Sequence, residues 1–273
     1  MKNLKHYAIA VVAAVLFSAC GTTRTVPLTG RKQNLMISDQ EVLSLSSQEY
    51  TKYMQGAKKS ADATNTAMVQ RVGQKLANAV QNYLTNNGYA NELQNYAWEF
   101  NLTQDNQLNA FCMPGGKIVV YSGMLNLIGN GADRDDELAA VIGHEVGHAI
   151  AKHGQERASQ QLLQQLGGQL LGAAVAGKTA ETQQAVALAY GMGAQYGALL
   201  PFSRKHEAEA DYMGLALMTM AGYDPDSAPA FWRKMAAAGS GKTPELLSSH
   251  PSDASRVAAL QKALPEIKAK YKP

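Results

Sequence analysis

The stretch His144-Glu145-Val146-Gly147-His148 decides the fold, because it places two histidines four residues apart inside a predicted helix. That helix is expected over residues 133–152. Acidic residues at its start favour a helix N-terminus, and Lys152-His153-Gly154 supplies a cationic end and a glycine stop. Residues four apart lie on one face of a helix, about one turn from each other. Both neutral imidazoles can therefore bind the same zinc ion.

Glu145 follows the first histidine, so its carboxylate can reach a water on the metal rather than the metal itself. Zinc lowers the pKa of such a water, and the carboxylate can take its proton so that a carbonyl carbon is attacked. The alternative is a surface helix with two histidines and a chance glutamate. Histidine is scarce, with 6 in 273 residues, and Glu145 has apolar neighbours. The pattern therefore favours a catalytic zinc site.

A third protein ligand is needed, because catalytic zinc sites combine three protein ligands with one water. A third histidine six residues after the second is absent, since position 154 is glycine. His153 lies about 140° around a continuous helix from His148, so it is interpreted as a helix-end residue that favours the C-terminal dipole.

The segment 203–211 supplies the better candidate, Glu207, on a second predicted helix. Asp211 lies one turn further on the same face and can accept the remaining N–H of a liganding histidine. Spacing alone leaves His206 as a competitor for the ligand role. The alternative is an ordinary charged, solvated helix face.

Taken together, these residues resemble the HtpX-like and CAAX-prenyl-endopeptidase-like family of gluzincin zinc metallopeptidases, in its periplasmic lipoprotein form. The resemblance spans roughly residues 109–256 in the family's order. It rests on His144 to His148 with Ala151-Lys152-His153-Gly154, Ser203-Arg204 before Glu207, Glu209-Ala210-Asp211 with Gly214, Asn109-Ala110-Phe111 with Pro114-Gly115-Gly116, and His250-Pro251 with Arg256.

The resemblance implies one zinc ion per chain, held by His144, His148 and Glu207, with Asp211 supporting a ligand. It also implies that Asn109, Ala110 and Phe111 pair with an extended polypeptide substrate as a strand added at a sheet edge.

Two later residues have alternative roles under the same resemblance. His250 either donates a hydrogen bond to the oxyanion or occupies the fourth zinc position in a latent state. A histidine in a solvated turn is the plain alternative. Arg256 either binds a substrate carbonyl or carboxylate, or makes a surface ion pair.

The expected fold class is α+β and predominantly helical: a zincin-like catalytic domain with a small β-sheet whose edge strand binds substrate. Residues 39–273 form this domain. Residues 98–103, 108–113 and 117–121 read as strands, and 156–200 as a small-residue helix packed on the domain, with a membrane-dipping hairpin as the alternative. Helices are also expected from Asp39 and over 65–86, 204–220 and 253–268, with a mobile loop over 238–252.

Residues 1–19 resemble a lipoprotein signal peptide, with Lys2 and Lys5 before an apolar run over 8–17 and Cys20 as the lipidation site. An ordinary secretory signal is the alternative. Residues 20–38 are rich in Thr, Gly and basic residues and are expected to be a lipid-anchored tether. Gly21, in place of an aspartate, favours the outer membrane, facing the periplasm.

Without residues 1–19 the chain carries 23 basic against 22 acidic residues, which disfavours nucleic-acid binding. Cys112 then has no disulfide partner and is expected to be a small core residue. The predicted function is a zinc endopeptidase of the bacterial cell envelope that acts on misfolded or misassembled proteins. The alternative is a zinc-bearing chaperone or assembly factor with little proteolysis. Oligomeric state is left open.

Overall fold

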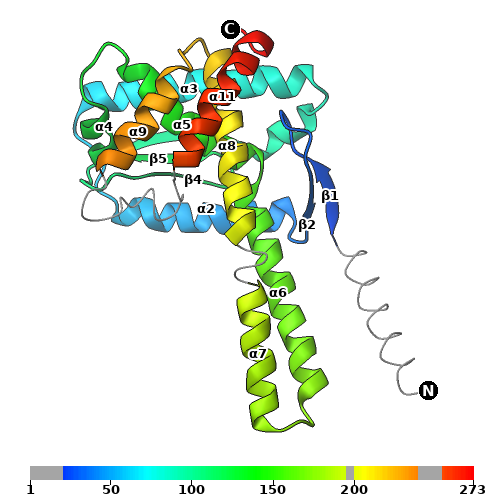
Figure 1. Cartoon of the computed structure of the whole chain (residues 1–273). Coiled ribbons are helices and arrows are strands. Elements are labelled where there is room, and N and C mark those ends of the chain that lie inside the picture. Colours follow the sequence, from blue (N-terminus) through cyan, green and yellow to red (C-terminus); the bar gives the residue numbers. More distant parts are fainter. Residues whose placement is uncertain (1–20, 195–199, 239–253) are drawn as a thin grey trace.

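The computed structural model describes residues 21–194, 200–238 and 254–273. Helices predominate around two small sheets, as the α+β prediction requires (Figure 1). The strands are β1 (Thr22–Thr25), β2 (Lys32–Leu35), β3 (Glu99–Thr103), β4 (Ala110–Met113) and β5 (Lys117–Tyr121). The helices are α2 (Asp39–Gly56), α3 (Ala63–Asn86), η1 (Ala90–Asn95), α4 (Ser122–Ile128), α5 (Arg134–Ile150), α6 (His153–Val175), α7 (Ala180–Ala194), α8 (Leu200–Met220), α9 (Ser227–Ala238) and α11 (Ala254–Lys270).

The larger sheet has the order β3-β5-β4, so β4 is an outer strand. β3 runs parallel to β5, and β4 runs antiparallel to it. The β4–β5 turn contains Gly115 and Gly116 with φ of 91° and 81°, a region that glycine enters without steric cost. All three strands fall where the sequence predicts them, and β4 lies against α5.

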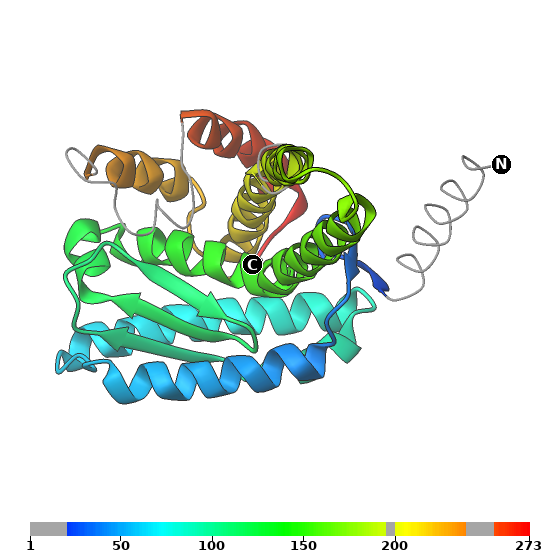
Figure 2. The same ribbon diagram turned by 90° about the horizontal axis from the view of Figure 1, so that it is seen from below.

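Both faces of this sheet are covered. Side chains alternate along β5, and each set packs into a different hydrophobic cluster. Val119 and Tyr121 pack with Tyr50 of α2 on one face. Ile118 and Val120 join the main core, which includes α3, on the other. Figure 2 shows α2, α3 and α5 running alongside the sheet.

The crossing of α5 and α8 forms the centre of the domain. Glycines stand where the two backbones approach most closely. A Cβ on Gly214 would lie 2.9 Å from the backbone nitrogen of His144, and a Cβ on Gly147 would lie 2.9 Å from the carbonyl oxygen of Ala210. The absence of these side chains brings the two ligand-bearing helices close together.

The predicted tether over residues 20–38 is wrong for residues 22–35. β1 and β2 form an antiparallel hairpin, with Thr22 opposite Leu35, that packs on the domain. Val26 is fully buried, and Arg24 donates to the carbonyl of Ile150 at 3.0 Å. The folded domain therefore begins near Thr22 rather than at residue 39. The polar partners of the hairpin lie far along the chain, from Glu92 to Glu209, where local pattern cannot reveal them.

The prediction of a packed helix over 156–200 is also wrong. α6 and α7 form a helical hairpin that projects away from the rest of the domain (Figure 1). Leu170 on α6 and Leu188 on α7 are 51% and 65% exposed. Only the start of α6 is buried, through residues such as Ser159. Among the described residues, no helix combines the length and apolarity needed to cross a bilayer.

Candidate active site

Three predicted ligands converge between α5 and α8. One donor atom from each of His144, His148 and Glu207 lies within 4.8 Å of the other two. The Nε2 atoms of the two histidines are 3.1 Å apart, and Glu207 oxygens lie 3.4 Å and 3.5 Å from them. Two imidazole nitrogens and one carboxylate oxygen form a donor set that zinc takes in catalytic sites. The residues fit a zinc ion.

Glu145, the predicted base, is 2% exposed on the same helix. Burial raises the pKa of the Cys112 thiol on β4, and the nearby Glu145 carboxylate raises it further. Burial lowers the pKa of Arg256, but Asp211 and Glu207 outweigh burial and raise it, and the Glu145 carboxylate adds to the increase. Glu145 therefore lies close enough to β4 and to the Arg256 guanidinium for its charge to act on both.

Asp211 supports His144, as predicted from its spacing. Its Oδ1 lies 2.9 Å from Nδ1 of His144, so that N–H donates to the carboxylate and Nε2 faces the other ligands. Burial alone would raise the pKa of Asp211. Hydrogen bonds from Arg256 and His144 outweigh burial and lower it. The carboxylate is thus held ionised, and it fixes the orientation of the ring.

Arg256 is buried within the site, so the surface ion pair considered for it is wrong. It is 7% exposed. Its guanidinium donates to both Asp211 oxygens at 2.7 Å and 2.8 Å, and Nη1 lies 3.3 Å from Glu207. The guanidinium also stacks over Trp232, 4.6 Å from the ring centre. Arg256 thus contacts both the predicted ligand Glu207 and Asp211. Contact with substrate stays a prediction.

His206 is not the third ligand. Its Nε2 lies 3.1 Å from Glu156, and its ring stacks on His153 with centroids 4.1 Å apart. The choice that spacing left open therefore falls on Glu207.

His153 was missed as a site residue, because α5 does not continue through it. α5 ends at Ile150, Lys152 takes a left-handed φ of 51°, and α6 begins at His153. The change of direction brings Nδ1 of His153 to 2.8 Å from Nδ1 of His148. Gly154 lies inside α6 and ends no helix, so local pattern gave no signal for the left-handed turn at Lys152 that defeats the 140° argument.

The predicted substrate strand occupies the outer position that strand addition requires. Asn109 directly precedes β4, and its carbonyl accepts from the N–H of Tyr121. Ala110 is fully buried, and Phe111 packs edge-on against Tyr53 with ring centroids 5.1 Å apart. Substrate binding by these three residues stays a prediction.

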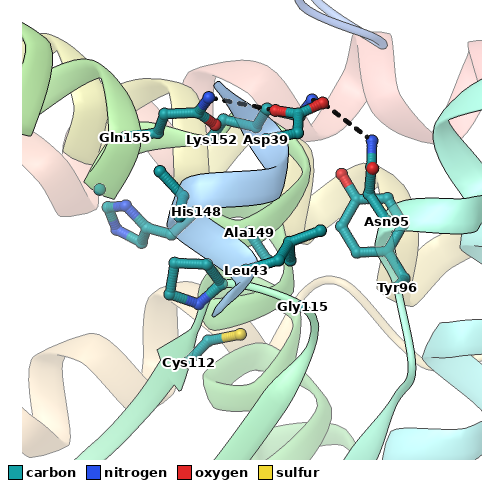
Figure 3. Close-up of a pocket in the computed structure, with 13 residues that line it drawn as sticks. Asp39, Leu43, Asn95, Tyr96, Cys112, Gly115, His148, Ala149, Lys152 and Gln155 are labelled. Carbon is teal, nitrogen blue, oxygen red and sulfur yellow. Dashed lines mark hydrogen bonds and ion pairs between the residues drawn. The ribbon is translucent and has the colours of Figure 1, made fainter. Parts of the chain in front are cut away.

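A cavity that opens to solvent adjoins the metal site on the His148 side (Figure 3). Cys112 of β4 lines it and is partly buried rather than fully in the core. Its lining is mostly apolar, with polar side chains such as Asp39 and Lys152, which are 2.6 Å apart. The lining residues are Asp39, Val42, Leu43, Asn95, Tyr96, Cys112, Pro114, Gly115, His148, Ala149, Lys152, Gly154 and Gln155.

Three sequence predictions lie outside the described residues: the signal peptide over 1–19, lipidation of Cys20, and the role of His250 with its loop.

The crossing of α5 and α8, the buried His-His-Glu set and the outer strand beside α5 define a metallopeptidase domain of the zincin class. The sequence profile of peptidase family M48 matches residues 63–264, and the chain belongs to that family. The gluzincin resemblance is thereby confirmed at the level of the family.

Curated relatives carry the names of peptidases. The chain is 40% identical over 171 residues to a mitochondrial metalloendopeptidase OMA1 from Arabidopsis thaliana, covering 63% of this chain and 32% of the relative. Similarity to the human OMA1 is 28% identity over 246 residues, covering 88% and 45%. A beta-barrel assembly-enhancing protease of Escherichia coli O157:H7 is 30% identical over 172 residues, covering 59% and 33%. The chain thus spans about a third to a half of these relatives.

Proposed function

We propose that this protein is a zinc-dependent endopeptidase of the bacterial cell envelope that cleaves misfolded or misassembled envelope proteins. The convergence of His144, His148 and Glu207 beside the buried Glu145 carries the proposal. Two of the relatives described above are named metalloendopeptidases, and a third is named for β-barrel assembly. Those names support both the reaction and the setting.

Bound zinc would supply Lewis acidity and lower the pKa of a water, so that a nucleophile forms near neutral pH. Glu145 would accept a proton from the attacking water as its oxygen adds to the carbonyl carbon, and would return that proton to the amine as the C–N bond breaks. Asp211 keeps the Nδ1 proton of His144 in place. Arg256 holds Asp211 by charge-assisted hydrogen bonds and Glu207 by an ion pair. His250 either donates to the oxyanion or occupies a latent fourth ligand position.

We further propose that the substrate is an extended polypeptide added to the outer edge of β4 along Asn109, Ala110 and Phe111. Backbone pairing of this kind accepts many sequences, which suits unfolded proteins. The apolar cavity between Cys112 and His148 offers room for a substrate side chain near the scissile bond (Figure 3). The protein would therefore favour chains that expose apolar residues.

The proposed location follows from the N-terminal sequence, whose apolar run and Cys20 resemble a lipoprotein signal. A lipid on Cys20 would hold the domain at the outer membrane, facing the periplasm. We place the protein, on the motifs quoted above, with the HtpX-like and CAAX-prenyl-endopeptidase-like members of the family.

Glu145→Gln tests the reaction. The variant should bind about one zinc per chain, as the wild type does, and should lose casein cleavage by several orders of magnitude. Glu137→Gln is the matched control, because Glu137 is equally buried on α5 but pairs with Lys234 at 2.7 Å, outside the site. The control should keep its cleavage rate.

Undiminished cleavage by Glu145→Gln would remove Glu145 as the base. A wild type that binds zinc and prevents aggregation of casein without cutting it would point instead to a chaperone or assembly factor.

A further inference from the structure

The second zinc-ligand histidine is held by another histidine rather than by a carboxylate. Nδ1 of His148 and Nδ1 of His153 are 2.8 Å apart, and Nε2 of His153 lies 2.9 Å from a Glu209 oxygen. His153 is 4% exposed, and Glu209 is 9% exposed. The rings of His148 and His153 meet edge-on, at 75°.

The directions of these hydrogen bonds follow from Glu209, the last residue in the series His148–His153–Glu209. An ionised Glu209 only accepts, so Nε2 of His153 carries the proton and donates. Nδ1 of a neutral His153 is then an acceptor, and Nδ1–H of His148 is its donor. This tautomer of His148 turns the lone pair of Nε2 towards His144 and Glu207, where the metal ligands converge.

Glu209 is in turn held by the loop between β1 and β2. Arg31 donates from Nε to Glu209 at 2.7 Å and makes two further bonds of 2.8 Å to Glu156. Thr29 of the same loop donates to the other Glu209 oxygen. The N-terminal hairpin, whose Arg31 and Thr29 lie 178 and 180 residues from Glu209 in sequence, therefore fixes the Glu209 carboxylate.

We propose that His153 is a positioning residue of the metal site, and that the chain Arg31–Glu209–His153 sets the tautomer and orientation of the ligand His148. The role mirrors that of Asp211 towards His144 on the opposite side of the site. This proposal rests on the proposed function and deepens it, because it gives the N-terminal hairpin a part in stabilising the metal site. Outer partners of liganding histidines typically change metal affinity ten- to hundredfold.

His206 offers a matched control within the same cluster. It is as buried as His153, stacks against it, and makes one ion pair of similar length with Glu156. A role in packing alone would give both histidines the same importance.

The test measures zinc affinity of the full chain by chelator competition, with the absorption spectrum of the Co²⁺-substituted protein as a second readout. His153→Asn places an amide oxygen near the position of Nδ1 and keeps the acceptor for His148. His153→Gln extends towards Glu209 and loses that acceptor. We expect His153→Asn to stay within about threefold of wild type, and His153→Gln to weaken zinc binding about ten- to hundredfold.

His206→Gln should leave both zinc affinity and the Co²⁺ spectrum unchanged. Arg31→Met should weaken zinc binding in the same direction as His153→Gln, because Glu209 loses its fixed position. Equal losses in His153→Asn, His153→Gln and His206→Gln would overturn the proposal in favour of packing alone. So would unchanged affinity in His153→Gln. These affinities do not depend on proteolysis, so they stand or fall separately from the proposed endopeptidase activity.

Discussion

Gly214→Ala should separate the two ligand-bearing helices and so damage both stability and zinc binding. The new Cβ would lie 2.9 Å from the backbone nitrogen of His144 and 3.1 Å from the carbonyl carbon of Gly143. Ordinary contact distances are about 3.5 Å or more, so α8 must withdraw by roughly 0.5 Å. Backbone atoms cannot rotate out of the way.

The expected loss combines two opposing effects. Overpacking costs about 1–3 kcal/mol, and we take about 3 because the obstructing atoms are backbone. Alanine in place of glycine within a helix returns about 1 kcal/mol. The net loss of about 2 kcal/mol corresponds to a fall in Tm of roughly 4–8 °C for a chain of this size. Since metal sites tolerate displacements of about 0.2 Å, zinc affinity should fall at least about tenfold.

Gly172→Ala on α6 is the control, because a Cβ there meets no atom within 4 Å. Thermal unfolding followed by circular dichroism and chelator competition for zinc measure the two effects. The reasoning is refuted if Gly214→Ala matches Gly172→Ala in both Tm and zinc affinity. A lower Tm with unchanged zinc affinity would show that the crossing contributes stability but does not position the ligands.

Three further predictions concern single side chains. Asp211→Asn should lower zinc affinity about ten- to hundredfold in chelator competition while the protein stays folded, because the support of His144 is weakened. Burial would raise the pKa of Glu156, but hydrogen bonds from Arg31 and His206 lower it from 4.5 to about 2. Its contribution to stability is therefore complete above about pH 4.5 and is lost as the pH falls towards 2. Tm of Glu156→Gln should accordingly vary less with pH over that range than Tm of wild type, and equal slopes would contradict this. Leu43→Trp should fill part of the cavity beside His148 and lower kcat/KM for peptides with bulky apolar side chains, with zinc content unchanged. An unaltered preference across a fluorogenic peptide series would exclude the cavity as a subsite.

Local sequence pattern sufficed to predict features that depend on a single helix or strand. The i, i+4 spacing of His144 and His148 needs only a helix, and the alternation over residues 98–103 needs only a half-buried strand. The choice of Glu207 as the third ligand required tertiary information, because His206 is equally well placed along the sequence. Only the rotation of α8 against α5 turns one towards the ligands and the other towards Glu156.

The sequence failed where polar residues are buried by distant partners. Gln33 is 3% exposed because its amide donates to the carbonyl of Ala151 at 2.9 Å and to Glu156 at 2.7 Å. Residues of this kind in a short segment rich in Thr and Gly favour a tether in any local interpretation. The prediction for His153 failed for a related reason, since the left-handed turn at Lys152 changes which side chains meet.

With the proposed lipid on Cys20, the position of the first strand would limit where this enzyme could act. β1 begins at Thr22, so only Gly21 separates the folded domain from Cys20. If Cys20 carries the lipid that we propose, the segment between the lipid and the domain is at most about 7 Å long. A free segment over residues 20–38 would extend to roughly 60 Å. The catalytic centre would then stand at a fixed height above the bilayer. Polypeptides stalled at the membrane surface would be within reach, and those diffusing freely through the periplasm would have to come to it.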